Sequence, residues 1–176
     1  LEQQALLSGV ITQNIDALHQ QAGSRRIREL HGSYWSASCI NCDNFATVGT
    51  SWRWWEDAMR SSPRSPVVSC PSCGGTVKPN VVFFGEAVRD FDEALEMVGR
   101  SDLLLVVGSS LSVYPAAYLP HYARGRVVVV NRGEVRLEPG RNRYFCQSGI
   151  DSFFMSVASH LGIRLEDEPE VVSGAV

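Results

Sequence analysis

Residues 103–110 read Leu-Leu-Leu-Val-Val-Gly-Ser-Ser, and this stretch decides the fold class. An uninterrupted apolar run followed by small polar residues is typical of a parallel strand that is covered on both faces. The run Val-Val-Val-Val-Asn at residues 127–131 repeats the pattern. The chain is therefore predicted to hold buried parallel strands whose ends carry polar groups.

Helical patterns alternate with such runs along much of the chain. We expect strands at 10–12, 81–84, 103–107 and 127–130, helices at 92–98, 116–122 and 153–161, and the end of a helix at 1–8. The alternation predicts an α/β fold with a partial doubly wound, Rossmann-like parallel sheet, which binds ligands at the carboxyl ends of its strands. Polar clusters at 12–14, 108–110 and 131–133 follow three strands, so we expect a cleft for a polar cofactor at one sheet edge.

The composition excludes several classes of function. The chain has 176 residues, 44% of them hydrophobic, which suits one α/β domain with a small appendage. A net charge of −3 with both signs interspersed offers no basic stripe for direct nucleic-acid binding. No apolar run reaches the roughly 20 residues of a membrane-spanning helix, and the first residues do not resemble a secretory signal.

We therefore expect a soluble, cytoplasmic protein that does not bind membranes. Among 16 basic residues only Lys78 is a lysine, which favours an arginine-rich genome and hence a bacterial source. If the source were eukaryotic, the mitochondrial matrix would be the expected location.

Two cysteine pairs lie within residues 33–80, a segment that also holds all four tryptophans and a serine- and proline-rich loop at 61–66. The pairs are Cys39 with Cys42 and Cys70 with Cys73. Four thiolates complete a tetrahedron around zinc and leave no position for water, so we expect one structural zinc in a small inserted ribbon module. The 27 residues between the pairs exceed the usual roughly 15–20, and redox-active or merely buried thiols are the alternatives. Cys146 has no partner in this pattern and is expected to be a small buried residue.

Polar residues gather after the strand predicted at 10–12. Gln13, Asn14 and Asp16 follow it directly, and His31 comes later in the same region. Asparagine and aspartate are also common in turns, and a lone histidine is commonly a surface or cap residue. Amides, a carboxylate and a histidine together favour a catalytic pocket, because imidazole ordinarily titrates near neutral pH and suits general-base work.

The segments Thr-Gln-Asn-Ile-Asp at 12–16, Leu-His-Gly at 30–32 and Gly-Ser-Ser-Leu at 108–111 resemble those of the sirtuins, a family of NAD-dependent protein deacylases. The resemblance extends through residue 131 and more loosely to about 162. It implies that Gln13, Asn14 and Asp16 contact nicotinamide and its ribose, with Asp16 holding the carboxamide. It also implies that His31 is the catalytic base, which takes a ribose proton after the acyl-lysine carbonyl oxygen has displaced nicotinamide, leading to O-acyl-ADP-ribose.

The same resemblance assigns further NAD contacts and the substrate channel. The implied cofactor-binding residues are Gly108, Ser109, Ser110, Asn131 and Gly133, although residues 108–110 alone also suit an ordinary turn between strand and helix. The segment 79–86 alone suits a core strand; the resemblance implies that its backbone pairs with an extended acyl-lysine peptide. The implied substrate-binding residues are Val82, Phe83, Gly85, Glu86 and Val113. The doubled phenylalanine and the long ribbon resemble the lipoamidase and ADP-ribosyltransferase branch, and bacterial deacetylases carry similar segments, so both branches stay open.

In that family a Gly-Ala-Gly-x-Ser phosphate loop precedes the matching region, so we expect this sequence to be a fragment, a split-gene product or a processed chain. The predicted division is a Rossmann-like domain at 1–32 and 81–165, the zinc ribbon at 33–80 and a tail at 166–176. Two functions remain. The first is an NAD-dependent lysine deacylase, with weak or no turnover by this chain alone; the second is a non-catalytic zinc-containing fragment that binds an acyl peptide or a partner.

Overall fold

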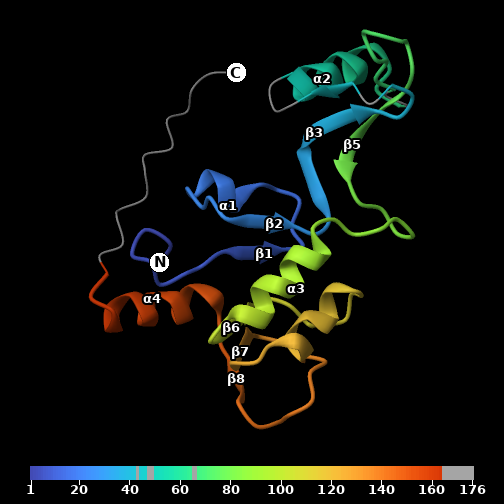
Figure 1. Ribbon diagram of the computed structural model, residues 1–176. Helices are drawn as coiled ribbons and strands as arrows, with labels where there is room; N and C mark the ends of the chain where they lie inside the picture. The colour runs from blue at the N-terminus through green and yellow to red at the C-terminus, as the bar shows by residue number, and fades with distance from the viewer. Residues whose placement is uncertain (43, 47–49, 65–66, 164–176) are drawn as a thin grey trace. The chain divides into compact units, whose positions relative to one another are not determined.

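The computed structural model describes residues 1–42, 44–46, 50–64 and 67–163 (Figure 1). The chain divides into two compact units, Leu1–Met97 and Val98–Val176. The tail predicted at 166–176, the last residues of the predicted 81–165 segment, and residues 65–66 of the serine- and proline-rich loop lie outside the described residues. No helix in the described ranges is long and apolar enough to cross a membrane.

The first unit begins with a pair of parallel strands. Strand β1 (Val10–Thr12), predicted from the sequence, pairs with β2 (Ile27–Glu29), and the short helix α1 (Leu18–Gln21) lies between them in the chain. The helix end predicted at residues 1–8 is wrong, because this segment forms successive turns. Ala5 has a φ of 55° there, a left-handed conformation that an α-helix does not accommodate.

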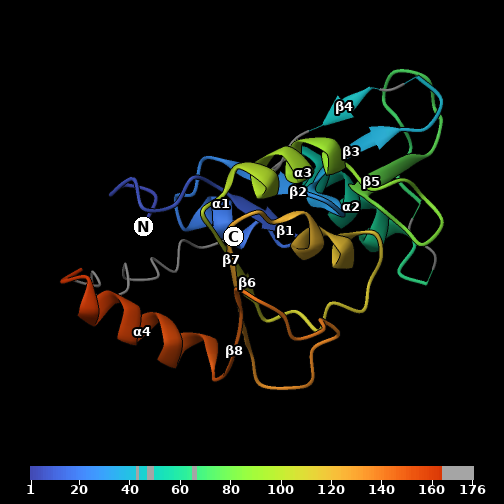
Figure 2. The same cartoon turned by 60° about the horizontal axis from the view of Figure 1, so that its bottom comes forward.

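The inserted module is an antiparallel sheet with a helix packed against it. Strand β3 (Gly32–Cys39) lies between β4 (Phe45–Ala46) and β5 (Val77–Val81), as Figure 2 shows. Helix α2 (Thr50–Ser61) contributes Trp55 and Ala58 to a core that is otherwise built from the sheet and the segment before β5. The buried members of that core are Ala37, Cys39, Val68, Cys70 and Val77.

The strand predicted at 81–84 is wrong in its bounds, because β5 ends at Val81. Val81 faces Gly32, the first residue of β3, so the antiparallel partner begins at that point. The backbone N–H of Val82 donates to the carbonyl of His31 over 2.8 Å, and a turn follows in which Gly85 has a φ of 91°. Val82 and Phe83 therefore lead out of the sheet.

The second unit holds a three-stranded parallel sheet. Its strands β6 (Leu103–Val107), β7 (Arg126–Asn131) and β8 (Arg143–Gln147) pair in that order. Helix α3 (Phe91–Arg100) joins the two units, and α4 (Ile150–His160) follows β8. These elements confirm the predicted strands at 103–107 and 127–130 and the predicted helices at 92–98 and 153–161; β8 was not predicted.

The predicted helix at 116–122 is present as a 3₁₀-helix, η1 (Ala116–Tyr122), which contains Pro120. Proline has no N–H to donate and so interrupts the hydrogen bonds of a regular α-helix, whereas 3₁₀-helices occur as short segments. Ala117 of η1 belongs to the buried core of this unit. That core otherwise contains Leu111, Val127, Val129 and Leu137.

Parallel strand pairs with intervening helices in both units confirm the predicted α/β class. The expectation that three polar strand ends share one sheet is wrong in part. The ends of β6 and β7 do share a sheet, whereas β1 pairs with β2 within the described residues. The predicted division into a domain at 1–32 and 81–165 and a module at 33–80 stays a prediction; the strands from β3 to β5 extend from Gly32 to Val81.

Candidate active site and metal centre

A hollow of about 470 Å³ in the first unit is lined by five of the residues that the sequence singled out, Gln13, Asn14, Asp16, His31 and Val82. Its walls come from the loop after β1, the junction of β2 and β3, and the end of β5. The lining residues are Gln13, Asn14, Ile15, Asp16, His31, Val81 and Val82. The structure thus brings the predicted base, the predicted amide and carboxylate groups, and one predicted substrate contact to a single place.

His31 is held in one orientation by its neighbours. Its Nδ1 lies 3.0 Å from the backbone carbonyl oxygen of Gln13. Because a carbonyl oxygen only accepts hydrogen bonds, this contact places a hydrogen on Nδ1, and in the neutral imidazole Nε2 then keeps its lone pair. The backbone is fixed as well, since Leu30 N–H donates to Thr12 O over 2.9 Å and Val82 N–H donates to His31 O. The half-buried imidazole is therefore a positioned proton acceptor at Nε2.

Gly32 is required at its position by the packing of two strands. Its φ is 70°, and a Cβ atom there would lie 1.9 Å from the carbonyl oxygen of Asn80 on β5. No side chain fits at that distance. The close approach of β3 to β5 beside His31 therefore depends on this glycine.

The loop after β1 is stabilised by its own polar groups. The N–H of Asn14 donates to Thr12 Oγ1 over 3.0 Å, and the N–H of Leu18 donates to Asp16 Oδ1 over 3.1 Å. One carboxylate oxygen of Asp16 thus fulfils the turn role that the sequence also allowed. The carbonyl of Asp16 accepts a 2.9 Å hydrogen bond from Trp35 Nε1, a contact that sequence reasoning missed.

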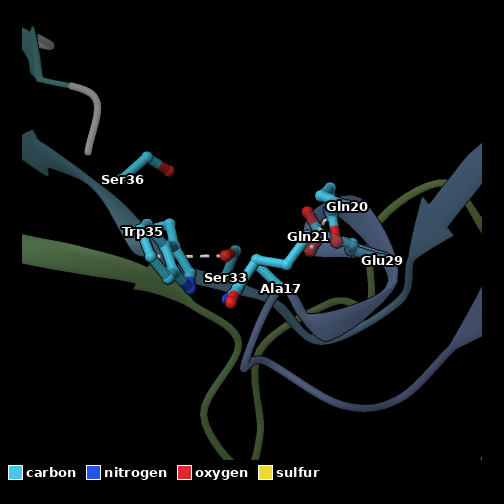
Figure 3. Close-up of a pocket in the computed structure, with 7 residues that line it drawn as sticks. All are labelled: Ala17, Gln20, Gln21, Glu29, Ser33, Trp35 and Ser36. Atoms are coloured by element: carbon cyan, nitrogen blue, oxygen red, sulfur yellow. Dashed lines mark hydrogen bonds between the residues drawn. The ribbon is translucent and has the colours of Figure 1, made fainter. Parts of the chain in front are cut away.

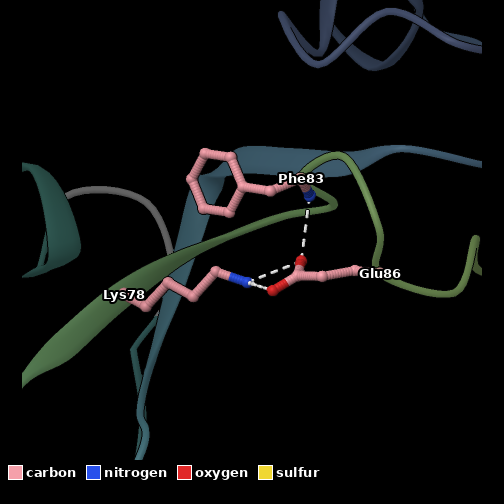
Figure 4. A network of polar contacts seen from close by, with 3 residues as sticks. All are labelled: Lys78, Phe83 and Glu86. Atoms are coloured by element: carbon pink, nitrogen blue, oxygen red, sulfur yellow. Dashed lines mark hydrogen bonds and ion pairs between the residues drawn. The ribbon is translucent and has the colours of Figure 1, made fainter.

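Phe83, Gly85 and Glu86, three of the predicted substrate residues, lie on the turn after β5, and Figure 4 shows Phe83 and Glu86 there. Both carboxylate oxygens of Glu86 lie within hydrogen-bond distance of Lys78 Nζ, at 2.6 and 2.7 Å, and one also accepts from Phe83 N–H over 2.9 Å. The Lys78 ammonium and the Phe83 N–H hold the pKa of Glu86 below its usual range. Glu86 therefore shapes the turn that presents Phe83, whose surface is 53% exposed, and Gly85 supplies the positive φ that this turn needs.

The remaining predicted NAD-binding residues lie in the second unit, after β6 and β7. Gly108 has a φ of 65°, and its N–H donates to Val130 O on the neighbouring strand over 2.9 Å. Asn131 at the end of β7 donates from Nδ2 to Gly133 O over 3.2 Å. The loop after β6 carries Ser109, Ser110 and the half-exposed Val113. Because β6 and β7 are adjacent, the two predicted clusters lie at one sheet edge.

The four predicted zinc ligands converge in the module. All their Sγ atoms lie within 4.8 Å of one another, with Cys39 and Cys73 at 3.5 Å and Cys42 and Cys70 at 3.8 Å. Zinc–sulfur bonds of about 2.3 Å in a tetrahedron place sulfurs about 3.8 Å apart. The donor set and its spacing fit one structural zinc, with the four cysteines as its ligands. Cys146 does not belong to this group; it lies on β8 of the second unit.

Backbone N–H groups point at several of these sulfurs. Cys70 Sγ lies 3.4 Å from the N–H nitrogen of Ser72. Burial opposes ionisation of Cys70, but the N–H groups of Ser72 and Cys73 outweigh it and lower its pKa to about 6. The N–H of Asn44 favours the thiolate of Cys42, yet the hydrogen bonds with the other thiols raise the pKa of Cys42 to about 12. Metal ligation requires thiolates, and a bound dication favours that form at thiols such as Cys42, whose pKa is raised.

Residues 1–115 match the model of the Sir2 family. An NAD-dependent protein deacetylase of Caldivirga maquilingensis is 46% identical over 134 residues, which cover 74% of this chain and 50% of that protein. The NAD-dependent protein deacetylase of Thermotoga maritima is 42% identical over 139 residues, covering 76% and 54%. The chain thus spans about half the length of the curated relatives it matches.

Solved structures give the same relationship. A structure described as Sir2 bound to acetylated peptide superimposes with a TM-score of 0.81 at 36% identity and covers 93% of this chain and 68% of that one. A complex of Sir2 with a p53 peptide and NAD⁺ has a TM-score of 0.80 at 37% identity, covering 93% and 67%.

Proposed function

Since the chain belongs to the Sir2 family, we propose that it supplies the base, the nicotinamide-side loop and the zinc module of an NAD-dependent protein-lysine deacylase. The observation that carries this proposal is the placement of His31. Its Nε2 is left with a lone pair by the Nδ1 contact to Gln13 O, in a hollow that Asn14 and Asp16 also line. The names of the relatives, deacetylase and deacylase, support the reaction class.

Each residue has a defined part in this proposal. NAD supplies, when bound, the ribose carbon whose bond to nicotinamide breaks as the acyl-lysine oxygen attacks it. Gln13, Asn14 and Asp16 contact nicotinamide and its ribose, and His31 Nε2 takes a proton from a ribose hydroxyl. One water from the solvent is consumed as the bond between the acyl carbon and the lysine nitrogen breaks, and the products are nicotinamide, O-acyl-ADP-ribose and the free lysine side chain.

The substrate peptide occupies the exposed backbone beyond β5. The proposed contacts there are Val82, Phe83, Gly85 and Glu86. Val113, on the loop after β6 of the second unit, is also proposed as a substrate contact. Main-chain pairing beyond β5 provides affinity for an extended acyl-lysine peptide with little demand on sequence. Complexes of Sir2 proteins with acetylated and propionylated peptides support this choice of ligand.

Further NAD contacts are assigned to the edge of the parallel sheet in the second unit. The residues are Gly108, Ser109, Ser110, Asn131 and Gly133. Small residues at the ends of parallel strands allow backbone N–H groups to reach polar parts of a cofactor. The zinc site has a structural role, because four thiolates leave no open position on the metal. A cytoplasmic location belongs to the same proposal, because reduced thiols persist in that compartment.

The test is NAD-dependent release of nicotinamide from an acetyl-lysine peptide by the purified chain and by its His31→Ala variant. Loss of release in the variant, with zinc content and far-UV circular dichroism unchanged, supports the proposal. Release that persists in His31→Ala contradicts it. No release from either protein, with one zinc bound per chain, fits both the weak turnover expected of this chain alone and a non-catalytic fragment; binding of the acyl peptide without binding of nicotinamide then favours the non-catalytic fragment.

A further inference from the structure

Strand β3 contains an irregularity beside the candidate site. Gly32 faces Val81 and Ser33 faces Asn80, but the next pair joins Ala37 to Pro79, so residues 34–36 are inserted between adjacent pairs. Pro79 has no N–H for a regular ladder, and the side chain of Asn80 donates to Ser36 Oγ over 2.9 Å. Bulges of this kind redirect side chains and occur often next to active sites.

The bulge directs two donors at the loop after β1. Tyr34 N–H donates to Ile15 O over 3.3 Å, and the indole Nε1–H of Trp35 donates to Asp16 O over 2.9 Å. The backbone N–H of Trp35 in turn donates to Ser33 Oγ over 3.3 Å, which Figure 3 shows as a dashed line. The zinc module thus donates hydrogen bonds to two successive carbonyl oxygens of the loop, those of Ile15 and Asp16.

Asp16 is the residue through which this contact reaches the hollow. Its carbonyl is bound by the indole, its Oδ1 accepts from Leu18 N–H, and the residue lines the hollow that contains His31. The indole N–H only donates, so its partner must be an acceptor, which here is the carbonyl oxygen of Asp16. Rotation of the Asp16 backbone would break the contact with Trp35 and move the carboxylate together with it.

We propose that Trp35 is a positioning residue, whose indole N–H, aimed by the bulge in the zinc module, fixes the turn at Asp16 and thereby the direction of its carboxylate. The consequence for nicotinamide recognition rests on the proposed function. The positioning of Asp16 in the free protein does not rest on the proposed function. The effect on nicotinamide recognition and the positioning of Asp16 are therefore measured in separate experiments.

The informative substitution is Trp35→Phe, which keeps an aromatic ring and removes the donor. Truncation to alanine would enlarge a second hollow of about 430 Å³ that Trp35 lines together with Ala17 and Ser33, and would mix packing with hydrogen bonding (Figure 3). Tyr34→Phe is the matched control. It alters the polar end of the neighbouring ring, which is 41% exposed, and keeps both donors to the loop.

The first measurement is the hydrogen exchange of the Leu18 amide in the free chain by NMR. This amide is bound to Asp16 Oδ1 and reports the position of the carboxylate. We expect exchange about fivefold faster in Trp35→Phe, the value for one lost neutral hydrogen bond, and an unchanged rate in Tyr34→Phe. Equal rates in Trp35→Phe and the unmodified chain would overturn the proposal.

The second measurement is the dissociation constant of nicotinamide, taken from the shifts of the loop amides. About fivefold weaker binding in Trp35→Phe, with unchanged zinc content, is the expected result. Unchanged affinity alongside faster Leu18 exchange would overturn the role in recognition. If the unmodified chain binds no nicotinamide, the proposed function fails, and the Leu18 exchange still decides whether Trp35 positions Asp16.

Discussion

Replacing Gly32 with alanine tests the packing that supports His31. Gly32 has a φ of 70°, and the added Cβ would lie 1.9 Å from Asn80 O and 3.0 Å from the carbonyl carbon. A left-handed alanine costs about 1 kcal/mol. Because the contact is with backbone, β3 and β5 must also separate, and two hydrogen bonds of about 1 kcal/mol each are then lost. We therefore expect Gly32→Ala to lower the free energy of unfolding by about 3 kcal/mol in total.

Gly23→Ala is the matched control for this prediction. Gly23 also has a positive φ, 85°, but its Cβ would meet nothing within 4 Å, so only the backbone cost of about 1 kcal/mol applies. The assay is urea unfolding in the presence of zinc, followed by tryptophan fluorescence. All four tryptophans lie between residues 35 and 55, so the signal reports the module that contains β3.

The comparison of the two variants decides the argument. If Gly32→Ala lowers the free energy of unfolding by about 2 kcal/mol more than Gly23→Ala does, the extra loss is assigned to the contact with Asn80. Gly32→Ala should then also release less nicotinamide in the presence of NAD, since Val82 N–H binds His31 O at the same junction. Equal losses in Gly32→Ala and Gly23→Ala would refute the reasoning, because the backbone conformation alone would then explain both.

Two further predictions concern the metal site and the turn after β5. Cys39→Ser should lose the zinc and the cooperative unfolding of the module, whereas Cys146→Ser should keep both, as measured by zinc content and thermal melting; zinc retention by Cys39→Ser would contradict the site. Because the pKa of Glu86 is lowered, its ion pair stabilises the fold above the ordinary carboxyl pKa, and the contribution is lost as pH falls through the lowered value. The Phe83 amide, followed by NMR, should titrate at higher pH in Lys78→Met; an unmoved midpoint would exclude Lys78 as the cause.

Several features could be predicted because their signal is local. The apolar runs at β6 and β7 and the amphipathic pattern of α3 identified those elements, and the comparisons confirm the family that the segments 12–16 and 30–32 indicated. The cysteine spacing predicted a cluster that the structure confirms. In each case the information lies in residues close together in the chain, or in a donor set whose chemistry allows few alternatives.

The errors arose where pairing between distant segments overrides local preference. The run Val-Val-Phe-Phe at 81–84 has a high strand propensity, yet β5 ends at Val81 because its partner begins at Gly32. Residues 1–8 contain good helix formers, yet they form turns, and the backbone N–H groups of Arg25 and Arg26 donate to the carboxylate of Glu2. A pattern of residue types does not contain these partners.

The sequence by itself determined the α/β class, the family, the zinc ligands and the histidine at the centre of the candidate site. Only the tertiary structure decided which nitrogen of His31 is free and that Trp35 binds Asp16, 19 residues away in the chain. Both depend on a carbonyl oxygen placed by the pairing of distant strands. Residue types determine which groups are able to bind, and the fold alone determines which of them meet within 3 Å.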